Sequence, residues 1–118
     1  HDVGALHAAS NQTHALTVVV VDNRGGGIFE HLPIANHPEA FERNFITPHE
    51  QDLVAVSRAA GVRAYKAEDL QSVTDLLSEE LERPGLAVIV VPTDRKLNTE
   101  VHRRLWREVE SALERERL

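Results

Sequence analysis

The sequence predicts an α/β fold in which a parallel sheet is covered by helices on both faces. Two runs, residues 16–21 and 86–91, are rich in β-branched side chains and lack polar alternation. Such runs are typical of strands that are buried on both faces, as in a parallel sheet. Expected helices alternate with these strands along the chain, and this alternation indicates right-handed βαβ units.

The N-terminal half begins with a weak helical pattern and continues into the first strand. Residues 2–14 carry small or apolar side chains at helical spacing, and residues 16–21 form the predicted strand. Residues 22–27 read Asp-Asn-Arg-Gly-Gly-Gly, which no regular element tolerates. We expect residues 28–45 to be irregular, with one helical turn near residues 39–43. A connection of this length is usually functional when it is rich in apolar residues.

The C-terminal half carries clearer signals for three helices and two strands. Thr47, Pro48 and Glu50 form the pattern of a capped helix start, so we expect a helix to about residue 60 that ends at Gly61. Residues 62–66 predict a short strand, and residues 69–83 a helix with one leucine-rich face. Residues 86–91 form the second central strand. Residues 98–117 predict a long amphipathic helix that packs on the sheet.

Composition excludes several functional classes. The chain has 118 residues, 42% of them hydrophobic and 27% charged, which is typical of one globular domain. It contains no cysteine, which excludes disulfides, cysteine zinc sites and thiol nucleophiles. A net charge of −6 argues against a nucleic-acid partner. No apolar run is long enough to span a membrane and no signal segment opens the sequence, so we expect a cytoplasmic protein.

The beginning of the sequence suggests a longer parent protein. The chain contains no methionine and begins with His1 and Asp2. These residues have helical rather than targeting character. We therefore expect the chain to be a piece of a larger polypeptide.

The glycine loop after the first strand is the strongest candidate for chemistry. Ligands of open α/β sheets bind beyond the carboxyl ends of strands, and residues 22–27 lie at such an end. Asn23 offers an amide oxygen, the glycines offer carbonyl oxygens, and bare backbone N–H groups can face a phosphate. These groups suit Mg²⁺ that carries a phosphate. The alternative is that the glycines only let the chain turn, and the dinucleotide and P-loop glycine patterns are both absent.

Other reactive residue types give no convincing site. The seven histidines are scattered, and we expect most of them to be structural or solvated. His31 and His37 are the exceptions to follow, because they lie close to the glycine loop. The serines fall in expected helices without a nucleophile-elbow motif. We expect Trp106 to be a packing residue.

The run Val-Val-Val-Asp-Asn-Arg-Gly-Gly-Gly-Ile-Phe at residues 19–29, followed by Leu32 and Pro33, resembles the thiamine-diphosphate enzymes. The resemblance extends over residues 1–118 and identifies them with the C-terminal part of the diphosphate-binding domain. It implies a Rossmann-like α/β fold. Gly-Gly-Ile-Phe with the following Leu-Pro is similar to the branch of this family that acts in menaquinone biosynthesis.

This resemblance implies the roles of individual residues. It makes Asn23 the side-chain ligand and Gly25 the carbonyl ligand of Mg²⁺ or Mn²⁺, with Gly26 and Ile28 completing the cofactor contacts. Ile28, Phe29 and Leu32 would line the pocket where cofactor and second substrate meet. The sequence departs from the family in two respects. Asp22 replaces the first asparagine of the usual pair, and the Gly-Asp that supplies a carboxylate ligand would precede His1.

The resemblance also implies an activity and partners. The parent would be a transferase that decarboxylates 2-oxoglutarate and adds the succinyl-semialdehyde unit to isochorismate. A glutamate on a pyrimidine-binding domain would act across a dimer interface, so the full-length enzyme is expected to be a homo-oligomer. We expect the 118 residues alone to be inactive and to bind the cofactor weakly. Two alternatives stay open: another thiamine-diphosphate decarboxylase or synthase, similar to acetolactate synthase, or a noncatalytic α/β interaction module.

Overall fold

The computed structural model describes residues 3–116, and the chain divides into two compact units. The sheet unit comprises the residues up to 22 together with residues 50–92. The loop unit comprises residues 23–49 and the residues from 93 onward. Along the sequence, the first boundary between them falls between Asp22 and Asn23, inside the predicted functional motif.

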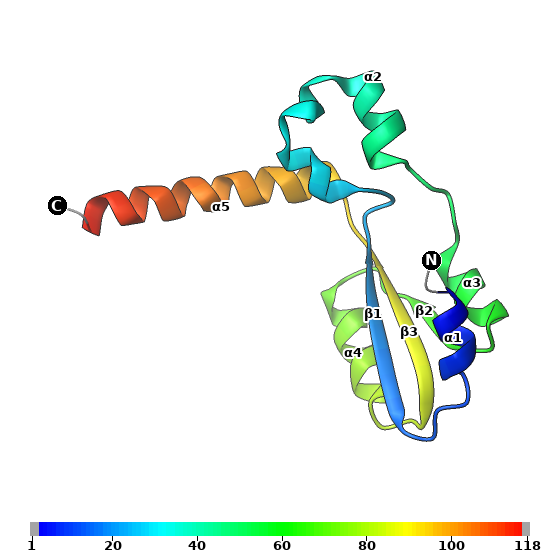
Figure 1. The fold of residues 1–118 in the computed structure, drawn as a ribbon. Helices are drawn as coiled ribbons and strands as arrows, with labels where there is room; N and C mark the ends of the chain where they lie inside the picture. The colour runs from blue at the N-terminus through cyan, green and yellow to red at the C-terminus, as the bar shows by residue number, and fades with distance from the viewer. Residues whose placement is uncertain (1–2, 117–118) are drawn as a thin grey trace. The chain divides into compact units, whose positions relative to one another are not determined.

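The sheet unit is built on a three-stranded parallel sheet in the order β1-β3-β2 (Figure 1). Its strands are β1 (Ala15–Asp22), β2 (Arg63–Lys66) and β3 (Gly85–Pro92). Val88 of β3 lies opposite Val18 of β1 and Ala64 of β2, and both pairings are parallel. All three predicted strands are therefore confirmed, as is their parallel arrangement.

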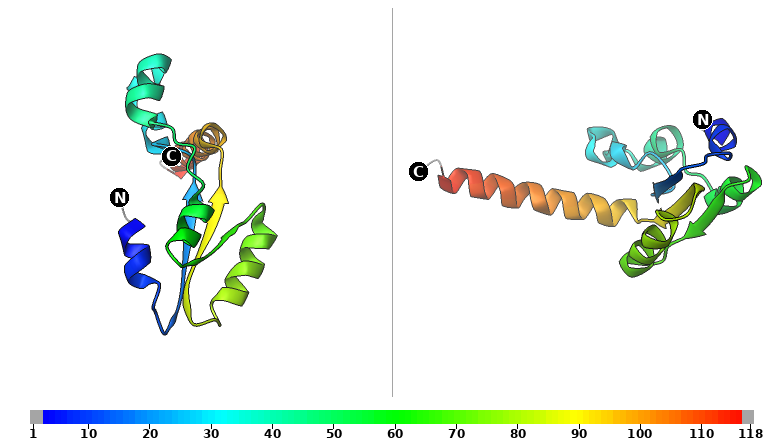
Figure 2. Two further views of the ribbon diagram at one scale, coloured as in Figure 1. Left: turned by 90° about the vertical axis from the view of Figure 1, so that its right-hand side faces the viewer. Right: turned by 90° about the horizontal axis from the view of Figure 1, so that it is seen from below.

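Helices lie on both faces of this sheet. They are α1 (Val3–Ala9), α3 (Leu53–Ala59) and α4 (Leu70–Glu80). α1 and α3 contact each other and β3, whereas α4 contacts β3 and β1. Figures 1 and 2 show α4 on the face opposite α1 and α3. The predicted α/β architecture with helices on both faces is confirmed.

The core of the sheet unit is centred on β3. The five consecutive residues 86–90 are each at most 5% exposed, because β3 has a strand on either side and helices on both faces. Leu86, Val88 and Val90 cluster with Ala60, Val62 and Ala64. Side chains alternate along a strand, so the fully buried Ile89 points to the opposite face.

β1 does not have the burial that its sequence predicts. We expected this apolar run to be buried on both faces, but Val18 is 38% exposed, Val19 40% and Val21 65%. The reason is its position, because within the part of the chain that the structure describes β1 pairs with β3 alone and forms the edge of the sheet. The β-branched composition of β1 therefore predicts the strand correctly and its burial wrongly.

Two predicted helix boundaries are also wrong. α1 ends at Ala9, whereas the helical pattern extended to residue 14, and residue 2 lies outside the described residues. α3 begins at Leu53, where the Asp52 Oδ1 atom accepts the Ala55 N–H at 2.9 Å, and not after Thr47. Thr47 has a left-handed φ of 45°, which an N-cap residue does not adopt. The predicted end is confirmed, since Gly61 follows the helix with φ 80°.

α4 begins where the sequence predicts, but fewer residues of its leucine-rich face are buried than the sequence predicts. The Ser72 N–H donates to Asp69 Oδ1 at 2.7 Å, and the Asp69 N–H donates to Ser72 Oγ at 3.0 Å. These two bonds form a capping box at the helix start. On the leucine-rich face that the sequence predicts, Val73, Leu76 and Leu77 are half-buried. Leu70 and Leu81, at the two ends of that face, are exposed.

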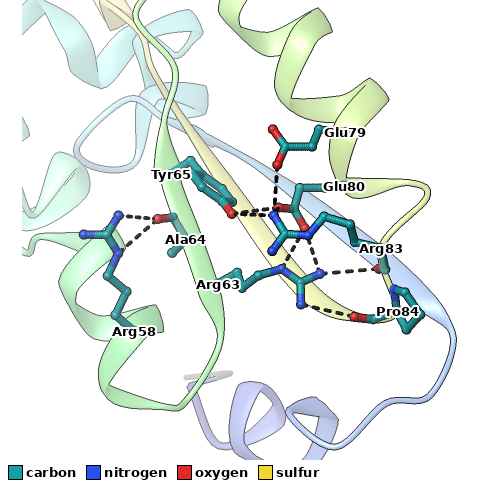
Figure 3. Close-up of polar contacts among 8 residues, drawn as sticks. All are labelled: Arg58, Arg63, Ala64, Tyr65, Glu79, Glu80, Arg83 and Pro84. Atoms are coloured by element: carbon teal, nitrogen blue, oxygen red, sulfur yellow. Dashed lines mark hydrogen bonds and ion pairs between the residues drawn. The ribbon is translucent and has the colours of Figure 1, made fainter.

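A buried carboxylate joins α4 to β2 (Figure 3). Glu80 is 1% exposed and accepts hydrogen bonds from Arg63 Nε at 2.8 Å, the Tyr65 hydroxyl at 2.7 Å and Arg83 Nη1 at 2.8 Å. Burial alone would raise the pKa of Glu80. The hydrogen bonds from Arg63 and Tyr65, together with the charges of Arg63 and Arg83, instead hold this pKa below its ordinary value. Arg63 also donates to the Pro84 carbonyl at 3.1 Å, which ties the network to the start of β3.

The loop unit consists of short helical turns and one long helix. They are η1 (Gly27–His31), η2 (Pro33–Asn36), α2 (Pro38–Phe41), η3 (Glu42–Ile46) and α5 (Arg95–Glu116). η1 and η2 are 3₁₀ helices, and η3 is a π-helix. The helical turn predicted near residues 39–43 is confirmed by α2 and η3. The rest of the segment is more helical than its prolines and mixed polarity suggested.

α5 is confirmed as a long helix. It begins at Arg95, three residues before the predicted start, where Asp94 Oδ1 accepts the Leu97 N–H at 2.8 Å. It belongs to the loop unit and contacts η1 there, and Leu105, Val109 and Leu113 stay 46–58% exposed. Among residues 3–116 no helix, α5 included, is both long and apolar enough to cross a membrane.

Candidate functional site

The glycine loop opens the loop unit with a tight turn around Asn23. The Asn23 Oδ1 atom accepts the N–H of Gly25 at 3.1 Å, so the amide side chain folds over the following backbone. Arg24, between them, has a left-handed φ of 58°. This turn directs the Asn23 amide toward the glycines, which is where the sequence predicts a ligand site.

The three glycines are required by close contacts. A Cβ atom on Gly25 would lie 2.6 Å from the Ile46 carbonyl oxygen, and one on Gly26 would lie 2.5 Å from the Phe45 carbonyl oxygen. A Cβ atom on Gly27 would lie 2.5 Å from the Asn23 Nδ2 atom. At Gly25 and Gly26 the loop therefore packs backbone to backbone on the end of η3, and a side chain at either position would force it away, whereas a side chain at Gly27 would displace the Asn23 amide.

The N–H groups of the three glycines are used inside the protein. The Gly25 N–H donates to Asn23 Oδ1, the Gly26 N–H to the Ile46 carbonyl at 2.9 Å, and the Gly27 N–H to the Gly25 carbonyl at 2.9 Å. The expectation that bare glycine N–H groups face a phosphate is therefore wrong for this structure. Their bonding fixes the shape of the loop.

The oxygens of the loop fit a hard cation. The Asn23 Oδ1 atom and the Gly25 carbonyl oxygen each carry two lone pairs, and the turn's own hydrogen bonds use one on each. Amide and carbonyl oxygens are ligands that Mg²⁺ accepts, together with carboxylates and substrate phosphates. Residues 3–116 contain no cluster of three or more His, Cys, Asp or Glu side chains that could hold a metal ion. The donor set here is thus two neutral oxygens, which suits a cation that takes its other ligands from an anionic cofactor and a separate carboxylate.

The predicted pocket residues fall into two groups. Ile28 is 75% exposed and Leu32 48% exposed, so both present apolar surface beside the loop. Phe29 is half-buried, with its ring centroid 5.8 Å from that of Phe45 in an edge-to-face contact. The Phe29 ring also closes over Gly26, where a Cβ atom would meet it at 2.8 Å. Phe29 therefore holds the loop onto η3, and Ile28 and Leu32 remain available for contacts.

An ion-pair cluster that the sequence did not suggest lies beside the loop. The Arg95 guanidinium pairs with Glu30 Oε1 at 2.7 Å and also donates to Glu42 Oε1. Arg103 donates to the Glu30 carbonyl oxygen at 3.1 Å. These charged residues lie 53–73 positions apart in sequence, so no local pattern relates them.

The two histidines near the loop have different environments. The His31 ring lies against α5, with its centroid 4.9 Å from that of Trp106 and 5.9 Å from that of His102. Its Nδ1 atom is buried. His37 is exposed at the start of α2. His31 and Trp106 thus form an aromatic contact between η1 and α5, although Trp106, which we expected to be a packing residue, is 55% exposed.

Comparison with known proteins identifies the loop's relatives. Residues 1–91 match the family described as "Thiamine pyrophosphate enzyme, C-terminal TPP binding domain". Three similar curated proteins carry the name 2-succinyl-5-enolpyruvyl-6-hydroxy-3-cyclohexene-1-carboxylate synthase. The one from Myxococcus xanthus (strain DK1622) is 41% identical over 115 residues, which are 96% of this chain and 19% of that protein.

The other two give the same coverage. The protein from Geobacillus kaustophilus (strain HTA426) is 38% identical over 92% of this chain and 19% of its own length. The protein from Listeria innocua serovar 6a is 34% identical over 96% of this chain and 20% of its own length. The chain therefore spans about a fifth of the length of the curated relatives it matches.

Proposed function

We propose a function on the premise that this chain belongs to the thiamine pyrophosphate enzymes and carries their C-terminal TPP binding domain. The proposal is that the loop after β1 holds the diphosphate end of the cofactor through a divalent cation. The observation that supports it best is the Asn23 turn, which sets an amide oxygen and the Gly25 carbonyl in one tight loop that the glycines keep free of side chains.

The residues of the loop would divide the work of binding. Asn23 Oδ1 and the Gly25 carbonyl would bind Mg²⁺ or Mn²⁺, and Gly26 and Ile28 would contact the cofactor. Phe29 would keep the loop seated on η3, since its ring covers Gly26. When bound, thiamine diphosphate supplies the electron sink for decarboxylation of a 2-oxoacid and transfer of the remaining carbon unit.

The reaction we propose for the complete enzyme follows from the name of the relatives and from the family resemblance. It is the decarboxylation of 2-oxoglutarate and the addition of the four-carbon unit to isochorismate, in menaquinone biosynthesis. The exposed side chains of Ile28 and Leu32, with Phe29 behind them, would line the pocket where the second substrate meets the cofactor. A pyrimidine-binding domain that acts across a dimer, in a cytoplasmic homo-oligomer, would complete the site.

The test is cofactor binding by the complete gene product that carries this chain. We expect Asn23→Ala to weaken Mg²⁺-dependent binding of thiamine diphosphate in isothermal titration calorimetry. The loss should exceed the roughly 10- to 100-fold effect that is typical of a residue acting on a metal ligand from outside the coordination shell. Asn44→Ala is the matched control, because Asn44 is an exposed asparagine of η3 in the same unit.

The cofactor affinity of Asn23→Ala also distinguishes the proposed function from a noncatalytic module and from another thiamine-diphosphate enzyme. Unchanged affinity in Asn23→Ala would mean that the loop is only a turn and would favour a noncatalytic module. Weakened affinity, together with turnover of a substrate pair other than 2-oxoglutarate and isochorismate, would keep the cofactor site and replace the proposed reaction with that of another thiamine-diphosphate enzyme.

A further inference from the structure

Arg95 connects the two segments that flank and support the glycine loop. It is the first residue of α5, and its Nη1 atom lies 2.7 Å from Glu30 Oε1 of η1. Its Nη2 atom donates to Glu42 Oε1 of η3. The side chains of Arg95 and Glu30 are only 18% and 14% exposed, so this ion pair is shielded from solvent.

Both partners of Arg95 belong to segments that determine the shape of the loop. Glu30 lies in η1, which begins at Gly27, the last residue of the loop. Glu42 begins η3, whose last residue, Ile46, accepts the Gly26 N–H at 2.9 Å. Arg95 therefore links the segment that follows the loop to the segment on which the loop rests.

Arg95 also lies next to the loop itself. A Cβ atom on Gly27 would come within 3.4 Å of the Arg95 Cβ atom. Two different guanidinium nitrogens are each engaged by a carboxylate, so the side chain is committed to protein partners. The planar, two-armed guanidinium can hold two carboxylates in fixed directions, which the single ammonium of lysine cannot do.

We propose that Arg95 is a positioning residue for cofactor binding: by holding Glu30 and Glu42 together, it keeps the glycine loop in the conformation that directs the Asn23 and Gly25 oxygens at the cation. This inference rests on the proposed function of the loop. It assigns no direct contact between Arg95 and cofactor or substrate.

The first test is thiamine diphosphate binding with Mg²⁺, measured by calorimetry in the complete gene product. Arg95→Gln keeps the length and polarity of the side chain approximately and removes its charge. We expect it to weaken binding by about 10- to 100-fold, the usual effect of losing a residue that orients a metal ligand. Arg95→Lys should fall between Arg95→Gln and the unaltered protein. Arg104→Gln is the control, because Arg104 lies on the same helix in an exposed ion pair with Glu108 at 3.7 Å.

A double-variant cycle distinguishes positioning from general destabilisation. If Arg95 acts through the loop, the variant with both Arg95→Gln and Asn23→Ala loses less affinity than the sum of the two single losses, because one of the two ligands that Arg95 positions is already gone. Additive losses would overturn the inference. Hydrogen exchange provides a readout without cofactor, since Arg95→Gln should speed exchange of the Gly26 N–H and leave the β3 amides unchanged.

A milder variant covers the case in which Arg95→Gln fails to fold. Glu42→Gln removes the charge of one partner and leaves the Arg95–Glu30 pair, and we expect it to show the same effects at smaller size. Normal binding and exchange in Glu42→Gln would then overturn the inference. If Asn23→Ala weakens binding and neither Arg95→Gln nor Glu42→Gln does, this inference fails and the proposed function stands. If Asn23→Ala has no effect, the proposed function fails and this inference fails with it.

Discussion

The sheet unit and the loop unit are stabilised in different ways. The sheet unit has a central strand with five consecutive buried residues, 86–90, and a buried carboxylate, Glu80, that three side chains saturate. In the loop unit the buried side chains among the described residues are those of Phe41, Ile46 and Thr99. Its segments are joined largely by backbone contacts to the glycines and by the Arg95 ion pairs.

This difference indicates where stability and function lie. Regions with few buried apolar contacts open at lower free energy than a packed core, and ligand-binding loops are drawn from such regions. The sheet unit can therefore act as a scaffold whose stability needs no ligand. The loop unit has few buried side chains, and a bound cation and cofactor would stabilise such a region by mass action.

The largest expected loss of stability comes from shortening a fully buried isoleucine of the sheet unit, and a fully buried isoleucine of the loop unit provides the comparison. Ile89 and Ile46 are both 0% exposed. We expect Ile89→Ala to lower the free energy of unfolding by about 4 kcal/mol, because it leaves a cavity in the core of the sheet unit. Ile46→Ala should leave the unfolding of the sheet unit nearly unchanged and speed amide exchange at Gly26, whose N–H donates to the Ile46 carbonyl. Urea unfolding and hydrogen exchange measure the two effects, and equal losses in urea would refute the distinction between the units.

The strands of the sheet unit show how far sequence predicts structure. β1 and β3 have similar β-branched sequences, and both were correctly predicted as parallel strands. Only β3 has the expected burial, because burial depends on the number of neighbouring strands, and β1 has one such neighbour among the described residues. Composition determines the preference of the backbone for a strand, whereas the environment of the strand depends on contacts made by distant parts of the chain.

The candidate site shows the same limit. The position of the loop and the hydrogen bond of the Asn23 turn involve residues within five positions of one another, whereas the contacts that require Gly25 and Gly26 come from Ile46 and Phe45. The Arg95 cluster depends on residues 53 and 65 positions away and leaves no trace in local sequence. Of the three occupied glycine N–H groups, only that of Gly26 has a distant acceptor, since Ile46 supplies it from a separate segment, whereas Gly25 and Gly27 use acceptors two residues away.

The second prediction concerns the buried carboxylate of the sheet unit. Its pKa is lowered in the folded protein, so Glu80 contributes stability at pH values above its ordinary pKa of 4.5, and this contribution is lost as the pH falls through the lowered value. We expect Glu80→Gln to destabilise the protein by about 3 kcal/mol at pH 7, because both carboxylate oxygens accept hydrogen bonds in the buried site and the glutamine Nε2 atom cannot accept. The difference from the unaltered protein should shrink as the pH is lowered below 4.5.

The control for this prediction is the neighbouring Glu79. Its side chain is 62% exposed and pairs with Arg83 at 3.0 Å across one helical turn. An exposed pair of this kind contributes only about 0.3–0.5 kcal/mol, so Glu79→Gln should have a small effect at pH 7. Urea unfolding of both variants from pH 3 to pH 8 provides the measurement. A Glu80→Gln effect that is independent of pH would contradict the assigned ionisation.

The smallest expected loss of stability comes from removing the N-cap of α3, and it tests where this helix of the sheet unit begins. The sequence pattern places a helix N-cap at Thr47, but the structure has Asp52 in that role, with its Oδ1 atom accepting the Ala55 N–H at 2.9 Å. Loss of an N-cap side chain costs about 1 kcal/mol, so Asp52→Ala should lower the free energy of unfolding by that amount. Thr47→Ala should not remove a cap, because Thr47 lies at the end of η3 with φ 45°. Urea unfolding of the two variants decides between the positions, and the reverse order of effects would show that the helix begins at Thr47, as the local pattern suggested.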